Sequence, residues 1–260
     1  MRVQLFEFED FPRFPNTLRE GGTDYLRYLL KILGFYKPVI PLIAEALKQS
    51  GETQIIDLCS GGGGNMEQIS LDLAAYTNQR IPIKLSDKYP NVNAFSYLKQ
   101  KTGGQIDFIE QSVDATAVPA NLKGLRTMFS AIHHFPPATV RSILKDATDS
   151  RIPIALFDGG DKNIFTFLAM PLLHPFGFLF FTPFFKPFKL SRLLLTYVLP
   201  LIPITTIWDG MASILRLYQP EELLQLAKEA NDNDYVWKAG KVKNKFGISV
   251  SYLIGYPRTE

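Results

Sequence analysis

The apolar positions of this 260-residue chain form short continuous runs that alternate with stretches of helical spacing. Five runs that predict β-strands lie in the first 160 residues, at 55–57, 81–85, 106–110, 125–130 and 152–157. Helices are predicted between them over 65–76, 91–101 and 138–148. Because strands alternate with helices, the pattern predicts a parallel sheet with helices on both faces, which is an α/β fold.

Both ends of the chain extend this pattern. Before the first strand, the spacing predicts one helix from Thr23 or Asp24 to Leu33 and a second over 39–49. Near the other end, Pro220 opens a helix that runs to Ala230, and proline suits the first turn of a helix. Two final strands are predicted at 235–239 and 248–256, joined by a basic turn.

The segment Asn163–Ile207 departs from the alternation. Residues 164–185 carry no formal charge and include eight phenylalanines, a length that would suit a membrane span. Pro171, Pro175 and Pro183 predict breaks in any regular helix there, because each proline removes a hydrogen-bond donor. A cationic trio follows and precedes a second apolar stretch, 193–207. We therefore expect an apolar hairpin inserted after the fifth strand.

Three roles are open for the hairpin 163–207. It can cover the active site and line a pocket for an apolar substrate, because ligands in such folds bind at the carboxyl ends of strands. It can contact a membrane surface, with Lys186, Lys189 and Arg192 at anionic head groups. It can also form a dimer contact, and the sequence leaves the oligomeric state undetermined.

The strongest chemical signal is the strand that ends at Asp57 and runs into four consecutive glycines, 61–64. Glycine allows a sharp turn and a close approach of the backbone to a ligand. A phosphate-binding P-loop would need lysine and a hydroxyl residue next, and a dinucleotide fingerprint would need a third glycine where Met66 or Glu67 stands. The loop is therefore predicted to hold a nucleoside cofactor without a pyrophosphate.

The order of acid, glycine loop and later acids resembles the class I S-adenosylmethionine-dependent methyltransferases. In that family an acid precedes a G-x-G-x-G loop, and here Cys59 stands in the place of the first glycine while Gly61 and Gly63 fill the others. The segment 112–115 resembles the one whose acid meets the adenine amino group, and 131–136 resembles the turn under the methionine part of the cofactor.

The resemblance covers about residues 50–160 and implies a seven-stranded, mostly parallel, doubly wound sheet. It implies S-adenosylmethionine as the cofactor and assigns an acid after the second strand to the two ribose hydroxyls. The cofactor-binding residues that we predict from it are Asp57, Ser60, Gly61, Gly62, Gly63, Asp87, Lys88, Asp114, Ala115 and Ser130. Transfer of a methyl group from a sulfonium is an in-line displacement, so no metal is expected.

Two residues outside the resemblance are further candidates for the cofactor site. Arg19 and Tyr25 lie in a polar cluster near the start of the chain. An arginine can hold the carboxylate of the cofactor by a two-pronged hydrogen bond. The alternative for Arg19 is a surface ion pair with Glu20 or Asp24.

Catalytic residues are less well defined, because a base is needed only for some acceptors. His134 follows the fourth strand and is a candidate base, because an imidazole in general titrates near neutral pH, although a structural role fits it as well. His133 is expected to point the other way. Asp158, after the fifth strand, and Asp209 are further candidates, because loops should approach the pocket there.

Composition agrees with an enzyme that has one main domain. The 28 basic and 25 acidic residues show no basic stripe, so nucleic acid is not expected as a partner. One cysteine excludes an internal disulfide and a zinc site, and the polar residues 1–10 predict no signal peptide. We expect a cytoplasmic protein, peripheral on the inner membrane face if the hairpin contacts lipid.

The whole chain, 1–260, is predicted to be a single methyltransferase domain. Its predicted parts are an N-terminal helical cap (1–50), a cofactor-binding core (51–160), the apolar insertion or lid (161–213), and the last helix with the final strand pair (214–260). The predicted reaction is methyl transfer to an apolar small-molecule or lipid-like acceptor. The alternative is a non-catalytic protein that keeps the fold and binds a membrane or a protein partner through its insertion.

Overall fold

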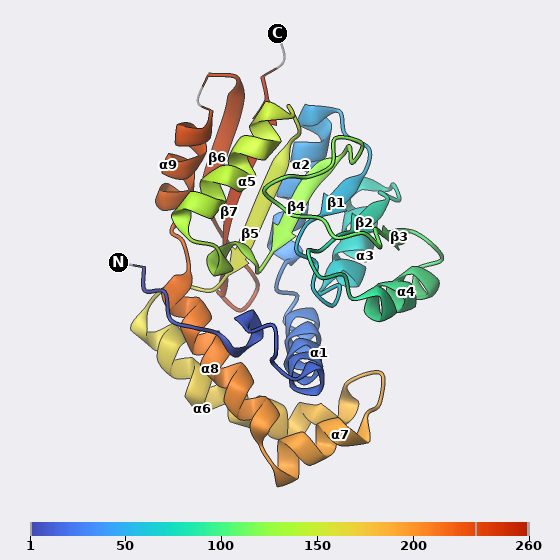
Figure 1. Ribbon diagram of the computed structural model, residues 1–260, viewed down its shortest axis with the longest axis vertical. Coiled ribbons are helices and arrows are strands. Elements are labelled where there is room, and N and C mark those ends of the chain that lie inside the picture. Colours follow the sequence, from blue (N-terminus) through green and yellow to red (C-terminus); the bar gives the residue numbers. More distant parts are fainter. Residues whose placement is uncertain (1, 232, 259–260) are drawn as a thin grey trace. The chain divides into compact units, whose positions relative to one another are not determined.

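The computed structural model describes residues 2–231 and 233–258 (Figure 1). It divides into two compact units. The sheet unit consists of Gly34–Gly159 and Tyr218–Glu260, and the helical unit consists of Met1–Leu33 and Gly160–Leu217. Residues 34–50, which the sequence analysis placed in the N-terminal cap, therefore belong to the sheet unit. The prediction of a single methyltransferase domain stays a prediction.

The sheet unit contains seven strands in the order β3-β2-β1-β4-β5-β7-β6. Their bounds are β1 Ile55–Asp57, β2 Ile83–Leu85, β3 Ile106–Phe108, β4 Leu125–Phe129, β5 Ile154–Gly159, β6 Tyr235–Lys243 and β7 Ser249–Pro257. The first five strands are parallel, while β7 runs antiparallel to both β5 and β6. The predicted seven-stranded, mostly parallel sheet is confirmed.

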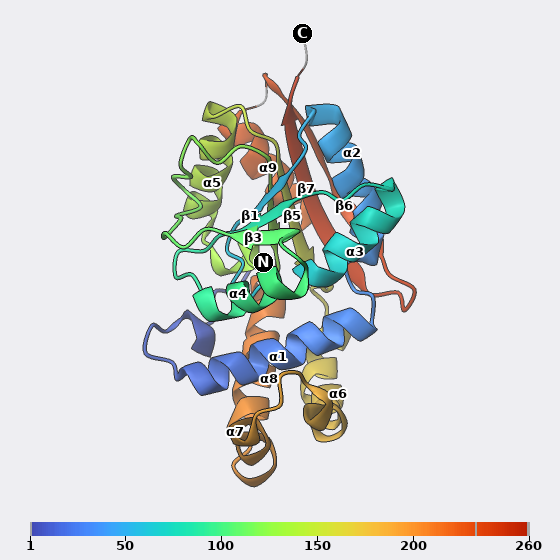
Figure 2. The ribbon, with the colours of Figure 1, turned by 90° about the vertical axis from the view of Figure 1, so that its right-hand side faces the viewer.

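Helices cover both faces of this sheet. They are α2 Ile40–Ser50, α3 Met66–Thr77, α4 Val92–Lys101, α5 Pro137–Asp149 and α9 Pro220–Ala230. The helices α5 and α9 pack together on one face, and α2 packs with α3 on the other (Figure 2). The strands β1, β4 and β5 are buried on both faces because helices cover both, and Ile56, Met128 and Leu156 lie in the core beneath α5 and α9.

The register brings the functional strand ends to one edge. Asp57 at the end of β1 lies beside Leu85 of β2 on one side and Thr127 of β4 on the other. The strands β2 and β4 lie on opposite sides of β1, so the strand order reverses there. This is the switch point at which ligands bind in open α/β sheets.

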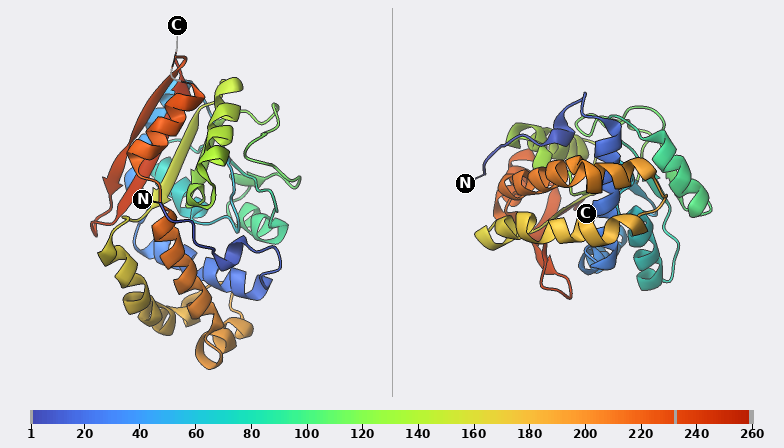
Figure 3. Two further views of the ribbon diagram at one scale, coloured as in Figure 1. Left: turned by 60° about the vertical axis from the view of Figure 1, so that its left-hand side comes forward. Right: turned by 90° about the horizontal axis from the view of Figure 1, so that it is seen from below.

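The helical unit is built from four α-helices and short turns. The α-helices are α1 Asn16–Ile32, α6 Ile164–Phe181, α7 Leu190–Leu193 and α8 Leu201–Arg216. The turns are η1 Phe8–Asp10, η4 Thr182–Phe184 and a π-helical turn at Leu194–Val198. The helices α6 and α8 lie side by side (Figure 3). Tyr25 of α1 stacks on Phe178 of α6 with 3.8 Å between ring centroids, and its hydroxyl bonds to His174 Nδ1 at 2.9 Å.

Two expectations about these helices were wrong. The helix α1 begins at Asn16, so Thr23 and Asp24 lie inside it and cap nothing. The Asp24 carboxylate is instead bound by the guanidinium groups of Arg27 and Arg192, and the Thr23 hydroxyl donates to the carbonyl of Arg19. Both polar side chains therefore have partners within the helical unit.

The second error concerns the prolines of the hairpin. The helix α6 runs without interruption through Pro171 and Pro175, and only Pro183 lies in the turn that ends it. The two internal prolines are four residues apart, so the backbone hydrogen bonds that they remove lie on the same side of the helix. Packing of the Phe178 ring against Tyr25 holds the helix together in spite of this loss.

Candidate functional site

The loop after β1 turns through an unusual series of left-handed residues. Cys59 has φ +56°, Gly61 +54°, Gly63 +83° and Gly64 +43°. Cys59 therefore adopts a backbone conformation that favours glycine, at a cost of about 1–2 kcal/mol for a residue with a Cβ. Backbone strain of this kind is typical of functional sites, where the surrounding structure maintains it.

A buried carboxylate holds this loop on the sheet. Asp57 is 2% exposed, and it accepts hydrogen bonds from Ser60 Oγ at 2.6 Å and from Thr127 Oγ1 at 2.8 Å. Burial raises the pKa of Asp57 to about 7, and the two hydroxyl bonds oppose that rise. Thr127 was not among the residues predicted from the sequence, although a hydroxyl residue within a predicted strand was a signal for it.

Asp87 connects the glycine loop to the end of β2. Its carboxylate accepts from the backbone N–H of Gly61 and from that of Tyr89, each at 2.8 Å. Its backbone carbonyl accepts the N–H of Val113 at 2.9 Å. The loops after β1, β2 and β3 are thereby joined through one residue, whose carboxylate is only partly buried.

Lys88 and Asp114 form an ion pair beside this junction, with 2.8 Å between Nζ and Oδ2. The hydrogen bond from Lys88, followed by those from Thr116, lowers the pKa of Asp114 to about 2. The structure thus brings together Asp57, Ser60, Gly61, Asp87, Lys88 and Asp114, as predicted. Their role in holding a cofactor stays a prediction.

Different structural features explain why glycine stands at different positions of the loop. A Cβ on Gly63 would lie 2.2 Å from Leu98 Cδ1 of α4, so packing as well as backbone conformation requires glycine there. A Cβ on Gly61 would meet no atom within 4 Å. The space beside Gly61 is therefore open, whereas Gly63 packs against α4, and its carbonyl accepts the N–H of Met66 at the start of α3.

Ser130 and Ala115 complete the predicted set at the strand ends. Ser130 has φ +48°, and its hydroxyl is hydrogen-bonded to the hydroxyl of Tyr36, while Ala115 is buried in the core. Burial raises the pKa of Tyr36. Sequence reasoning missed Tyr36, because nothing in the local pattern links it to a residue 94 positions away.

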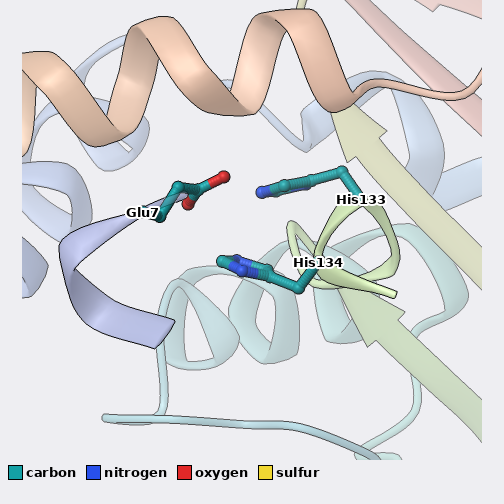
Figure 4. A group of neighbouring side chains, drawn as sticks. All are labelled: Glu7, His133 and His134. Atoms are coloured by element: carbon teal, nitrogen blue, oxygen red, sulfur yellow. The ribbon is translucent and has the colours of Figure 1, made fainter. Parts of the chain in front are cut away.

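The two histidines after β4 differ from expectation (Figure 4). Both lie in the turn Ile132–His134, and their ring centroids are 4.3 Å apart, so the expectation that His133 points the other way was wrong. His133 Nδ1 donates to the carboxylate of Asp158 at 2.8 and 2.9 Å, and both residues are buried. Asp158 is thus placed beside His133, and the His134 ring lies against the His133 ring.

The remaining candidates lie in the helical unit and have local partners. Arg19 donates to the carbonyl oxygens of Glu9 at 2.5 Å and Phe11 at 2.9 Å. Asp209 accepts the backbone N–H groups of Phe8 at 2.6 Å and Glu9 at 3.3 Å, and burial raises its pKa to about 6. Arg19 and Asp209 therefore stabilise the segment before α1, and the binding and catalytic roles of Arg19, Tyr25 and Asp209 stay predictions.

Comparison with known proteins gives a likeness in structure only. No family model and no curated protein sequence matches the chain. Its structure resembles the pyocyanin biosynthetic protein PhzM, with a TM-score of 0.51 and 13% identity over 96% of this chain and 62% of that chain. The chain therefore spans less than two thirds of that protein.

Two further solved structures are similar. Human N-acetylserotonin methyltransferase, determined in complex with S-adenosylmethionine, has a TM-score of 0.48 and 13% identity over 90% of this chain and 56% of that chain. The methyltransferase domain of bacterial CtHen1 has a TM-score of 0.49 and 10% identity over 86% and 100%. Together with the strand order, the likeness to PhzM establishes the class I S-adenosylmethionine-dependent methyltransferase fold.

The strain at Cys59 predicts a difference between two substitutions. Cys59→Gly should be more stable to urea than Cys59→Ala by about 0.5–1 kcal/mol. Both variants lose the sulfur, but only glycine relieves a left-handed backbone strain of about 1–2 kcal/mol. Glycine also lowers stability by about 0.4–1 kcal/mol relative to alanine, because it makes the unfolded chain more flexible. Equal stability of the two variants would show that Cys59 is not strained.

The raised pKa of Asp57 predicts a pH dependence of stability. Because the pKa is about 7 in the folded protein and about 3.9 in the unfolded chain, the folded state holds an extra proton between these values. The extra proton on Asp57 stabilises the folded state fully below about pH 4. As pH rises from about 4 to about 7, the free energy of unfolding falls by roughly 1.4 kcal/mol per pH unit, and above about 7 this stabilisation is lost. Asp57→Asn should remove this slope from urea unfolding midpoints, and an unchanged slope would contradict the assignment.

Proposed function

We propose that the protein is an S-adenosylmethionine-dependent methyltransferase that acts on an apolar small-molecule or lipid-like acceptor. The observation that carries this proposal is the strained loop after β1, held on Asp57 and bridged to the end of β2 by Asp87. Its position at the switch point of the sheet, and the fold itself, support the binding of a nucleoside cofactor there.

The open space beside Gly61 fits the proposed cofactor. Asp87 would bind the ribose hydroxyls and Asp114 the adenine amino group, while the backbone of the loop approaches the remainder. When bound, the cofactor supplies an activated methyl group. The residues of this chain would orient that group toward the acceptor and exclude water, which is the main protein contribution to an in-line displacement.

The pair formed by His133 and Asp158 supports a proton-accepting role near the end of β4. With Nδ1 donating to the carboxylate, Nε2 is the ring nitrogen that can act as a base. His133 therefore replaces His134 as the candidate base for acceptors that must lose a proton, with Asp158 holding its ring in position.

The apolar acceptor is proposed from the insertion that directly follows β5. Residues 163–208 contain no acid, and α6 has no Asp, Glu, Lys or Arg along its whole length. An insertion at the carboxyl end of a parallel strand begins where substrates bind in this type of fold. We also propose a cytoplasmic location and a peripheral contact of the hairpin with the inner membrane face.

Binding of the cofactor can be measured before the acceptor is known. Asp87→Ala should weaken the affinity for S-adenosylhomocysteine in calorimetry by about 10- to 150-fold, because a charge-assisted hydrogen-bond pair is worth roughly 1.5–3 kcal/mol. Asp107→Ala is the matched control, since that acid on β3 pairs with Lys99 at the protein surface. No binding by the unmodified protein would favour the non-catalytic alternative.

The acceptor can be sought with a labelled methyl group. Incubation with methyl-labelled cofactor and a lipid extract should give a product heavier by one methylene, provided that the acceptor is apolar. His133→Ala should abolish labelling, because it removes the proposed base, and leave S-adenosylhomocysteine affinity within about twofold. Labelling at an undiminished rate would remove His133 from the chemistry.

A further inference from the structure

The hairpin 163–207 exposes far more apolar surface than its fold requires. Ile164–Phe184 is long and apolar enough to cross a membrane, and only 6% of its 18-residue apolar stretch is buried. A core helix of the same composition would be mostly buried, and a signal sequence would lie near the start of the chain. Neither explanation accounts for this helix.

The exposed side chains of α6 form one continuous stripe. Phe165 is 82% exposed, Leu172 63% and Phe176 59%, and these residues recur at the spacing of helical turns. At 100° per residue they lie on the side of α6 opposite Phe178, whose ring is buried against Tyr25. Exposed apolar residues continue beyond α6 at Phe184, Phe188, Leu190, Leu194, Val198, Leu199, Leu201 and Ile204.

The surface formed by α6 and this continuation is the apolar surface of the hairpin. Single exposed apolar residues are normal, but soluble monomers seldom expose contiguous patches above about 300–600 Å². The apolar surface of the hairpin, a stripe along α6 with eight further exposed residues, is far more than scattered single positions. It therefore requires an occupant that is itself apolar over a large area.

The opposite side of the helical unit is charged. The helix α1 packs against α7 and α8 and carries Arg19, Glu20, Asp24, Arg27 and Lys31. Asp24 is bound by Arg192 in a buried ion pair, which fixes the charged helix to the end of the hairpin. The hairpin therefore cannot pass through a bilayer without taking α1 with it, and several charges in hydrocarbon are costly.

The cations of the hairpin contribute little attraction to lipid, which corrects the role predicted for them. Arg192 is 3% exposed and bound to Asp24, and Lys189 pairs with Glu20 at 2.7 Å. Lys186 is exposed, and no acid among the described residues pairs with it. One lysine near an anionic surface changes affinity only about fivefold, so charge is a minor part of any membrane contact.

We propose that the apolar surface of the hairpin inserts into one face of a lipid bilayer as a monotopic anchor, driven by apolar burial and not by head-group charge. The absence of any acid between residues 163 and 208 removes the charge that lipid head groups would repel. The charged helix α1 stays on the aqueous side. The proposal deepens the proposed function, since an anchored enzyme would take its acceptor from the lipid.

Vesicle flotation tests this directly with the full chain. The unmodified protein should float with neutral phosphatidylcholine vesicles and with vesicles that also contain phosphatidylserine, and about 1 M salt should not release it, because salt screens only charge. Leu172→Glu with Phe176→Glu should lower partitioning about 100-fold or more. Leu71→Glu is the matched control on α3, at 55% exposure, and should float like the unmodified protein.

Four results would overturn the proposal. The first is failure to float with either vesicle, and the second is flotation only with the anionic vesicle together with release by salt. The third is protein that stays with the vesicles in carbonate and leaves only with detergent, as a spanning segment would. The fourth is a stable dimer that the double variant dissociates. The last would assign the surface to a second copy. Should the double variant lose its helical circular dichroism, Phe180→Ser at another exposed position replaces it.

S-adenosylhomocysteine calorimetry on the same proteins separates this proposal from the proposed function. The variants of Leu172, Phe176 and Phe180 should bind with unchanged affinity, because they alter the helical unit only. Loss of flotation with retained binding therefore concerns the anchor, and absence of binding with retained flotation concerns the enzyme.

Discussion

The buried carboxylate of Asp57 is the interaction on which the rest of the site depends. Away from water, each of its oxygens needs a donor, and the hydroxyls of Ser60 and Thr127 supply them. Ser60 reaches back to Asp57 only because the chain reverses at Cys59, which adopts a left-handed conformation to do so. This reversal directs the N–H of Gly61 at Asp87 and so connects the ends of β1 and β2.

The same strand ends concentrate negative charge. Asp87 and Asp114 lie beside each other with Lys88 as their nearby cation, and burial of Asp57 holds its pKa near 7. The hydrogen bonds from Lys88 and Thr116 keep Asp114 ionised over the whole physiological range. A net negative potential at this edge would favour the cationic sulfonium of the proposed cofactor over its neutral product.

The helical unit solves a different problem, since it must order an apolar hairpin with few internal partners. It does so at three places: Tyr25 stacks on Phe178, Ile202 packs against Gly21, and Arg192 bonds to Asp24. A buried ion pair adds little net stability against an apolar pair, but it permits one arrangement of charges only. The outer side of the hairpin, by contrast, carries exposed apolar residues such as Phe165 and Leu172.

The sequence by itself determined the strands, their helices and the glycine loop, because these follow from local periodicity and from the backbone freedom of glycine. It also grouped Asp57, Asp87 and Asp114, since the carboxyl ends of parallel strands meet at one edge. It could not assign His133 to Asp158, Tyr36 to Ser130 or Arg192 to Asp24, because these pairings join residues 25, 94 and 168 positions apart. Only the tertiary structure decided which polar side chains are bound within the protein, and that α6 continues through its prolines, because packing compensates for hydrogen bonds that the local sequence forbids.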